Sequence, residues 1–243
     1  ETEFLKALYE ASKDHSNVHM ILLDEMNIAR IEYYFADFLS VLERERQEEW
    51  LVNLVPSEKG NDPENIRAGS IRVTNNIWFV GTANHDDSTF MISDKVYDRA
   101  IPIHFKNRGE KFDSRWDKQI EITAQDLQEM FEKAQTSYPL SDANIKKIRR
   151  LDDYLKENFD ITFGNRIDNQ IHRFIPVYMG CGGGFNEAFD VLLERKILRK
   201  LENLFSEGMR GKLDDLESEI AQVFGPNSMH SSIRYLAKLR GRL

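Results

Sequence analysis

The chain has 243 residues, of which 41% are hydrophobic and 30% charged, and its formal net charge is −8. This composition is typical of a folded globular protein, and it excludes a disordered chain and a surface that is basic throughout. The single cysteine, Cys181, excludes an intrachain disulfide and a cysteine-rich metal site, which fits a reducing cytoplasm.

No apolar run reaches the roughly 20 residues of a membrane-spanning helix, so we expect no membrane partner. The chain begins at Glu1 without an initiating methionine or a signal peptide. We therefore expect it to be an excerpt of a longer protein.

The first elements alternate between helix and strand. Helical spacing of apolar residues predicts an amphipathic helix that ends near Asp14. A short apolar run over 18–23 suits a buried parallel strand, and Asp24 and Glu25 follow it directly. Apolar residues at intervals of three and four then predict a helix from Ile31 to Leu42.

The next stretch combines loops and further strands. Glycine and proline between two apolar pieces over 48–74 predict a hairpin or a long surface loop. A second buried strand is predicted at 77–80, and the polar sequence Gly81-Thr82-Ala83-Asn84 follows it. A third strand is predicted at 101–105, although Pro102 argues against a central position in a sheet.

Helical periodicity dominates after about Asn107. Helices are predicted over 127–134, 145–155, 167–175, 185–205, 213–224 and 233–239. We therefore predict two domains, an α/β part over 1–112 and an all-helical part over 113–243.

The acidic pair after the first strand is the first candidate for chemistry. Parallel strands place their carboxyl ends at the ligand-binding edge of an open α/β sheet. There Asp24 would hold Mg²⁺, usually through water, and Glu25 would polarise the water that attacks a terminal phosphate. The alternative is that both carboxylates cap the following helix, where negative charge is favourable.

Two later residues extend this candidate site. Asn84 ends the next strand, where its amide would orient the attacking water; alternatively it is an ordinary turn residue. Arg99 ends a plausibly helical stretch before the third predicted strand, and a lone arginine in such a place is usually a solvated surface group.

The order of these features resembles the second half of an AAA+ nucleoside-triphosphatase module. The resemblance is to the branch that holds the MoxR-type ATPases, the midasin and dynein modules and the McrB-type restriction GTPases. It is carried by Ile21-Leu22-Leu23-Asp24-Glu25-Met26-Asn27-Ile28-Ala29, Val80-Gly81-Thr82-Ala83-Asn84 and Ser93-Asp94-Lys95-Val96-Tyr97-Asp98-Arg99-Ala100.

This resemblance implies roles for the candidate residues. Asp24 and Glu25 would be the Walker B pair, Asn84 the sensor-1 residue, and Arg99 an arginine finger acting on nucleotide held by a neighbouring subunit. The fold would be the C-terminal part of an AAA+ core with a parallel sheet, followed by a helical lid.

The lid would supply a further arginine to the nucleotide. The segment from Phe163 to Ile171 resembles the stretch that carries the sensor-2 arginine, which makes Arg166 the first candidate and Arg173 the second. The alternative is that Arg166 forms a local salt bridge.

One part of the family's site is absent from the sequence. No Gly-x-x-x-x-Gly-Lys-Ser/Thr motif occurs, so the loop that cradles the β- and γ-phosphates is missing. In the family this loop lies upstream, after a strand that would pair between those predicted at 77–80 and 101–105. We expect the isolated chain to bind nucleotide poorly; the alternative is a degenerate relative that has lost the loop.

The nucleotide and the partners follow from the resemblance alone. McrB-type GTPases carry Asn-Thr-Ala-Asp-Arg around the sensor, whereas this chain reads Asn84-His85-Asp86-Asp87-Ser88, which favours ATP over GTP. The resemblance implies a homo-oligomeric ring that uses Mg²⁺ and nucleotide to drive remodelling or translocation. In a McrB-like restriction system the partners would be DNA and a nuclease subunit. The alternatives are a non-catalytic AAA+-like scaffold and a helical DNA-binding regulator.

Overall fold

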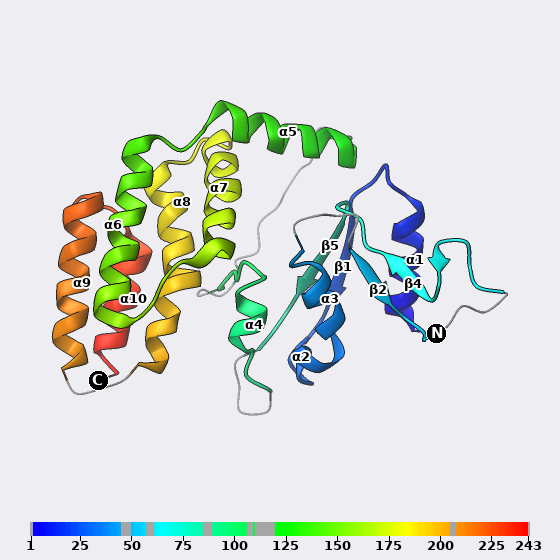
Figure 1. The fold of residues 1–243 in the computed structure, drawn as a ribbon, viewed down its shortest axis with the longest axis horizontal. Helices are drawn as coiled ribbons and strands as arrows, with labels where there is room; N and C mark the ends of the chain where they lie inside the picture. Colours follow the sequence, from blue (N-terminus) through cyan, green and yellow to red (C-terminus); the bar gives the residue numbers. More distant parts are fainter. Residues whose placement is uncertain are drawn as a thin grey trace. The chain divides into compact units, whose positions relative to one another are not determined.

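The computed structural model describes residues 2–44, 50–56, 61–84, 89–105, 109, 120–204 and 208–242, with Asn203 described by its backbone only. The fold is mixed α/β and comprises two compact units, Glu1–Gln128 and Glu129–Leu243 (Figure 1). The domain boundary predicted between residues 112 and 113 lies outside the described residues, so it stays a prediction.

The first unit contains short helices and two small sheets. Its elements are α1 (Glu3–Lys13), β1 (His19–Leu23), α2 (Ile31–Tyr34), α3 (Ala36–Val41), β2 (Leu51–Asn53), β3 (Ile66–Arg67), β4 (Ser70–Arg72), β5 (Ile77–Gly81) and α4 (Asp94–Tyr97). A longer helix, α5 (Ala124–Ser137), spans the division between the units. The predicted first helix, the two predicted strands at 18–23 and 77–80 and the predicted hairpin region are confirmed. The prediction that both strands are buried is wrong for one face of the sheet.

The central sheet of this unit is a parallel pair, β1 and β5 (Figure 1). Ile21 lies opposite Phe79 and faces the core. The other face carries two cross-strand apolar pairs that are exposed, Met20 (62%) with Trp78 (38%) and Leu22 (57%) with Val80 (38%). Parallel sheets normally have both faces covered, so this apolar face is unusual.

Aromatic rings hold the helices against the buried face. Phe35 stacks on Phe38 with a centroid separation of 4.8 Å, and its ring meets Phe79 of β5 edge-on at 5.3 Å. Phe4 of α1 contacts Phe38 at 5.1 Å. The helix predicted from Ile31 to Leu42 is interrupted at Phe35, where φ is −112° and ψ is 11°. The break occurs where these rings converge, so tertiary packing overrides the local helical period there.

The segment between α3 and β5 forms a three-stranded antiparallel sheet in the order β2-β4-β3. Val52 and Ile71 are cross-strand partners, and both are buried. Gly69 turns the chain between β3 and β4 with φ +73°, and a Cβ atom there would lie 2.4 Å from the carbonyl oxygen of Val55. Both the backbone conformation and this close approach require glycine.

The strand predicted over 101–105 is wrong. These residues belong to no strand, and Ile103 and Phe105 are exposed by 69% and 92%. A strand forms only when its backbone groups pair with a neighbour, and no described segment pairs with 101–105 in a sheet. The apolar residues of this stretch therefore predicted a strand that joins no sheet within the described residues.

The second unit is helical throughout its described residues. It contains α6 (Asp142–Phe159), α7 (Gly164–Gly180), α8 (Phe185–Leu192), α9 (Met209–Phe224) and α10 (His230–Arg240). Each predicted helix of this region is present. The single helix predicted over 185–205 changes character, because α8 continues as a π-helical stretch at Leu193–Ile197 and a 3₁₀ stretch at Leu198–Asn203.

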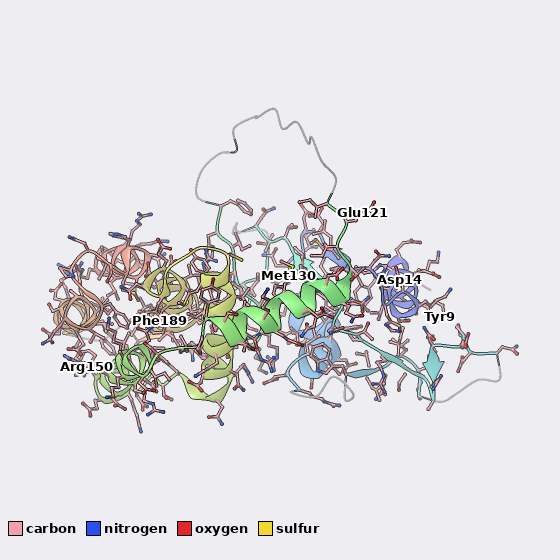
Figure 2. All side chains as sticks on the ribbon, turned by 90° about the horizontal axis from the view of Figure 1, so that it is seen from above. Tyr9, Asp14, Glu121, Met130, Arg150 and Phe189 are labelled. Atoms are coloured by element: carbon pink, nitrogen blue, oxygen red, sulfur yellow. The ribbon has the colours of Figure 1, made fainter. Side chains whose placement is uncertain are left out.

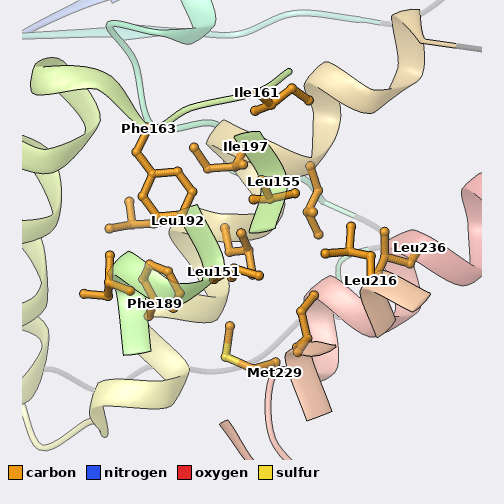
Figure 3. Close-up of a cluster of buried hydrophobic side chains, with 14 of the residues drawn as sticks. Leu151, Leu155, Ile161, Phe163, Phe189, Leu192, Ile197, Leu216, Met229 and Leu236 are labelled. Carbon is orange, nitrogen blue, oxygen red and sulfur yellow. The ribbon is translucent and has the colours of Figure 1, made fainter. Parts of the chain in front are cut away.

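A continuous apolar core holds these helices together. Figure 3 shows its side chains pointing toward one another from several helices, including Leu151 and Leu155 from α6, Phe189 from α8 and Leu216 from α9. At the edge of this core Asp190 caps α10, because its carboxylate accepts hydrogen bonds from the amides of Ser231 (2.7 Å) and Ser232 (2.8 Å). No described helix is long and apolar enough to cross a membrane.

A polar turn after α1 leads the chain into β1. The Asp14 carboxylate, labelled in Figure 2, accepts hydrogen bonds from the Asn17 side-chain amide (2.9 Å) and the Ser16 backbone amide (2.9 Å), and it contacts His19 Nε2 at 3.1 Å. These donors lower the pKa of Asp14 from 3.8 to about 2, with the Asn17 amide contributing most.

This shift predicts a contribution of Asp14 to acid stability. The pKa of the Asp14 carboxyl is lower in the folded state than in the unfolded state. Its contribution to the free energy of unfolding is therefore complete above about pH 4 and is lost as the pH falls through about 2. We expect Asp14→Asn to reduce the free energy of unfolding at pH 5, and the difference from wild type to shrink between pH 4 and pH 2. Denaturant unfolding of both proteins across this range measures the difference, and a constant difference would contradict the assignment.

Candidate functional site

The candidate site lies at the carboxyl edge of the parallel sheet. β1 and β5 are in register, with Leu23 opposite Gly81, so the residues that follow both strands emerge at the same edge (Figure 1). The first strand leads to Asp24 and Glu25, and the second leads to Thr82 and Asn84. The side chains of all four residues are exposed.

Thr82 joins the two segments at this edge. Its hydroxyl donates a hydrogen bond to Asp24 Oδ1 at 2.5 Å and accepts one from the Glu25 amide at 2.8 Å. Two backbone hydrogen bonds extend the connection, from the Thr82 amide to the Leu23 carbonyl (3.0 Å) and from the Met26 amide to the Thr82 carbonyl (2.8 Å). The hydroxyl therefore fixes the Asp24 carboxylate. Sequence reasoning gave Thr82 no role, although it lies in the quoted Gly-Thr-Ala-Asn stretch.

Glu25 has an unusual backbone conformation. Its φ is +48°, in the left-handed region that residues with a side chain rarely adopt. Such a conformation costs on the order of 1–3 kcal/mol and is often found at functional sites. Its amide hydrogen bond to Thr82 holds this conformation in place.

The alternative of simple helix capping does not hold for the acidic pair. The next helix, α2, begins at Ile31, and its N-cap residue is Arg30, with no side-chain capping bond. Asp24 and Glu25 lie several residues earlier, in the turn that follows β1. Their position therefore needs an explanation other than helix capping.

Close packing beneath the site places β5 against the segment after β1. A Cβ atom at Gly81 would lie 2.1 Å from Met26 Sδ, so a larger residue there would require the Met26 side chain to move. The carbonyl of Met26 accepts a hydrogen bond from the Tyr34 hydroxyl at 2.8 Å. Partial burial raises the pKa of Tyr34, so this phenol remains a donor at neutral pH.

Asn84 is held through its main chain. Its carbonyl accepts hydrogen bonds from Asn27 Nδ2 (2.8 Å) and from the Thr89 hydroxyl (2.8 Å), while its side chain is exposed. Asn27 is buried, and sequence reasoning gave it no role beyond its place in the family motif. Residues 85–88, which the preference for ATP over GTP rests on, lie outside the described residues.

Arg99 is not a solvated surface group. Only 19% of its side chain is exposed, and its guanidinium forms an ion pair with Glu43 and donates a hydrogen bond to the Lys95 carbonyl. An arginine-finger role would require this ion pair to open. Nothing in the sequence pointed to Glu43, which lies 56 positions from Arg99.

The two lid candidates belong to the second unit. Arg166 lies in the first turn of α7 and Arg173 lies seven residues later, so both fall on one face of the helix, and both are exposed. The start of α7 is fixed by a hydrogen bond from the Phe163 amide to the Asp152 carboxylate at 2.8 Å. Their relation to Asp24 and Glu25 stays a prediction.

The Asp24 and Glu25 carboxylates supply oxygen ligands of the kind that Mg²⁺ prefers. No group of three or more His, Cys, Asp and Glu side chains that could enclose a metal occurs among the described residues. Mg²⁺ typically keeps several waters and binds one or two carboxylates together with substrate phosphates. One oriented, exposed carboxylate at Asp24 matches that requirement.

Comparisons of the chain with protein-family models, with curated proteins and with solved structures return no match. A function is therefore inferred from the geometry of the chain's own residues.

Proposed function

We propose that this chain carries the hydrolytic half of a nucleoside-triphosphatase site of the AAA+ type, acting on ATP, or GTP, with Mg²⁺. One observation carries the proposal: two parallel strands in register deliver Asp24-Glu25 and Thr82-Asn84 to the same sheet edge. There the Asp24 carboxylate is oriented by a hydroxyl, and Glu25 is held in a left-handed conformation.

Each residue at the edge has a distinct role in this proposal. Asp24 holds Mg²⁺ through water, with Thr82 fixing the orientation of its carboxylate. Glu25 accepts a hydrogen bond from the attacking water and aligns it, and Asn84 holds the same water from the neighbouring strand. Bound Mg²⁺ would neutralise charge that develops on the phosphate oxygens.

The proposal requires a phosphate-binding loop that residues 1–243 do not contain. The exposed apolar face formed by Met20, Leu22, Trp78 and Val80 supports a further packing segment, because a parallel sheet normally has both faces covered. We infer that the segment with the phosphate loop packs on this face and adds a strand beside β5.

In this proposal Arg99 contacts the nucleotide that a neighbouring subunit holds. Its ion pair with Glu43 would open when ring assembly brings a phosphate within reach. Arg166, with Arg173 second, would contact the nucleotide from the lid. The substrate that is remodelled, including DNA handled with a nuclease partner, does not follow from these residues, since one fold serves many functions.

A non-catalytic scaffold is the second candidate function. The observation that favours it is the ion pair between Arg99 and Glu43, which occupies the arginine within its own unit. In that case Asp24 and Glu25 would contact neither metal nor nucleotide.

Nucleotide hydrolysis distinguishes the two candidates. ATP and GTP turnover is measured for residues 1–243 alone and for the longer polypeptide that includes the phosphate loop. We expect turnover by the longer polypeptide and none above background by residues 1–243, because the β- and γ-phosphates lack their cradle there. Absence of turnover in both, at protein concentrations where rings assemble, would favour the scaffold.

A further inference from the structure

Asn27 connects the segment after β1 to the segment after β5. Its side chain is only 2% exposed, and its Nδ2 donates hydrogen bonds to the carbonyls of Asn84 (2.8 Å) and Phe90 (3.0 Å). Its own carbonyl accepts a hydrogen bond from the Phe90 amide at 2.9 Å. One buried residue therefore holds the main chain at both Asn84 and Phe90.

Neighbouring contacts strengthen this junction. The Thr89 hydroxyl donates to the same Asn84 carbonyl at 2.8 Å. The Arg30 guanidinium lies 5.5 Å from the centre of the Phe90 ring, a cation–π contact from the same turn that carries Asn27.

The side-chain amide has one allowed orientation. Nδ2 faces two carbonyl oxygens, so exchanging the oxygen and nitrogen would place Oδ1 against both of them. In the observed orientation Oδ1 is buried and has no hydrogen-bond partner among the described residues. The contacts of Nδ2 alone therefore set which way this amide faces.

The hydrogen bond between Asn27 and Asn84 lies next to the candidate site. Beyond the last ladder pair, the two segments are joined first at Glu25–Thr82, then at Met26–Thr82, and finally at Asn27–Asn84. The Asn27 contact is the one that reaches the residue assigned to the attacking water.

We propose that Asn27 is a positioning residue for hydrolysis. It holds the main chain of Asn84 so that the side-chain amide of Asn84 and the carboxylate of Glu25 form hydrogen bonds with the same water molecule. This inference rests on the proposed function. Loss of the Nδ2 donor would leave the Asn84 carbonyl held by the Thr89 hydroxyl alone and loosen the position of Asn84, leaving the magnesium and phosphate contacts in place.

The chain contains a matched control in Asn76. This residue is also buried (3% exposed), and its Nδ2 likewise donates to two backbone carbonyls, those of Asp14 (2.7 Å) and Asn17 (2.9 Å). It lies at the opposite, amino-terminal edge of the same sheet, where its carbonyl accepts from the His19 amide. Substitution there removes the same pair of Nδ2 hydrogen bonds away from the site, and alanine also removes the hydrogen bond that Asn76 Oδ1 accepts from the Thr74 hydroxyl.

The experiment compares Asn27→Asp and Asn27→Ala with Asn76→Asp and Asn76→Ala in the longer polypeptide that hydrolyses nucleotide. Thermal unfolding establishes the folded fraction, and kcat and KM are measured per folded protein. We expect both Asn27 variants to lower kcat by about 10- to 100-fold with KM changed by less than about threefold, since small misplacements of catalytic groups have effects of this size. Both Asn76 variants keep the wild-type kcat.

Each other outcome overturns the assignment. A wild-type kcat in the Asn27 variants, or an equal loss in the Asn76 variants, removes Asn27 from positioning. Unfolding of the Asn27 variants alone makes Asn27 a structural residue. Failure of the proposed function gives a different result, because the wild-type protein then shows no nucleotide turnover. If only this inference fails, the wild-type protein is active and Glu25→Gln is inactive.

Discussion

In the longer polypeptide that the proposed function requires, we expect Glu25→Gln to abolish hydrolysis and leave nucleotide binding intact. A positioned acid–base residue typically contributes about 10²- to 10⁴-fold to the rate, so turnover falls by that factor. Glutamine keeps the size of glutamate and lacks the charge that aligns and polarises the water.

The structure gives a reason for binding to survive this change. The hydrogen bond that anchors residue 25 comes from its backbone amide to Thr82, so it persists when the side chain changes. The Asp24 carboxylate, which is assigned to Mg²⁺, is held separately by the Thr82 hydroxyl.

Steady-state turnover and equilibrium binding of a fluorescent nucleotide measure the two effects. Glu64→Gln is the matched control, because Glu64 is an exposed acid in the same unit and the substitution removes the same charge. Wild-type turnover by Glu25→Gln would remove Glu25 from the mechanism. Equal losses in both variants would indicate a general charge effect.

The second large effect concerns the core of the helical unit. Phe189 on α8 is 1% exposed and lies in the core together with Phe163 (Figure 3). Its ring centroid lies 5.2 Å from that of Phe224, 6.0 Å from that of Phe185 and 6.2 Å from that of Phe163. Truncation to alanine removes this buried ring and leaves a cavity among the other three. We expect Phe189→Ala to lower the free energy of unfolding by about 3–5 kcal/mol.

Denaturant unfolding of residues 1–243, followed by far-UV circular dichroism, measures this loss because the second unit contains most of the long helices. Phe189→Leu keeps part of the buried volume and is expected to lose less. Met130→Ala on α5 is the surface control, since Met130 is 58% exposed and such changes usually stay within about 0.5 kcal/mol. A loss below about 1 kcal/mol for Phe189→Ala would show that neighbouring rings fill the space.

Local patterns predicted most of the elements. Apolar runs bounded by polar residues located both strands of the parallel sheet, and the helical period located every helix of the second unit. These predictions succeed because burial of one face imposes a period on the residues themselves. The pattern was insufficient at 101–105, where a strand depends on a partner, and at Phe35, where packed rings interrupt a helix.

The candidate site was predicted only in outline. The positions of Asp24, Glu25 and Asn84 after buried strands indicated one sheet edge, and the register of β1 with β5 brings their segments together. The residues that hold them, Thr82 and Asn27, are ordinary polar side chains in the sequence. No local pattern distinguishes a threonine or asparagine that bridges two strands from one that lies in a turn.

The sequence by itself determined the alternation of strands and helices, the helical second part and the order of the candidate catalytic residues. Only the tertiary structure decided that Thr82 orients Asp24, that Asn27 holds Asn84, and that Arg99 pairs with Glu43. These contacts join residues 56 to 58 positions apart. Periodicity reports which face of an element is buried, whereas such contacts depend on the path of the whole chain, which brings the ends of separate strands to one edge.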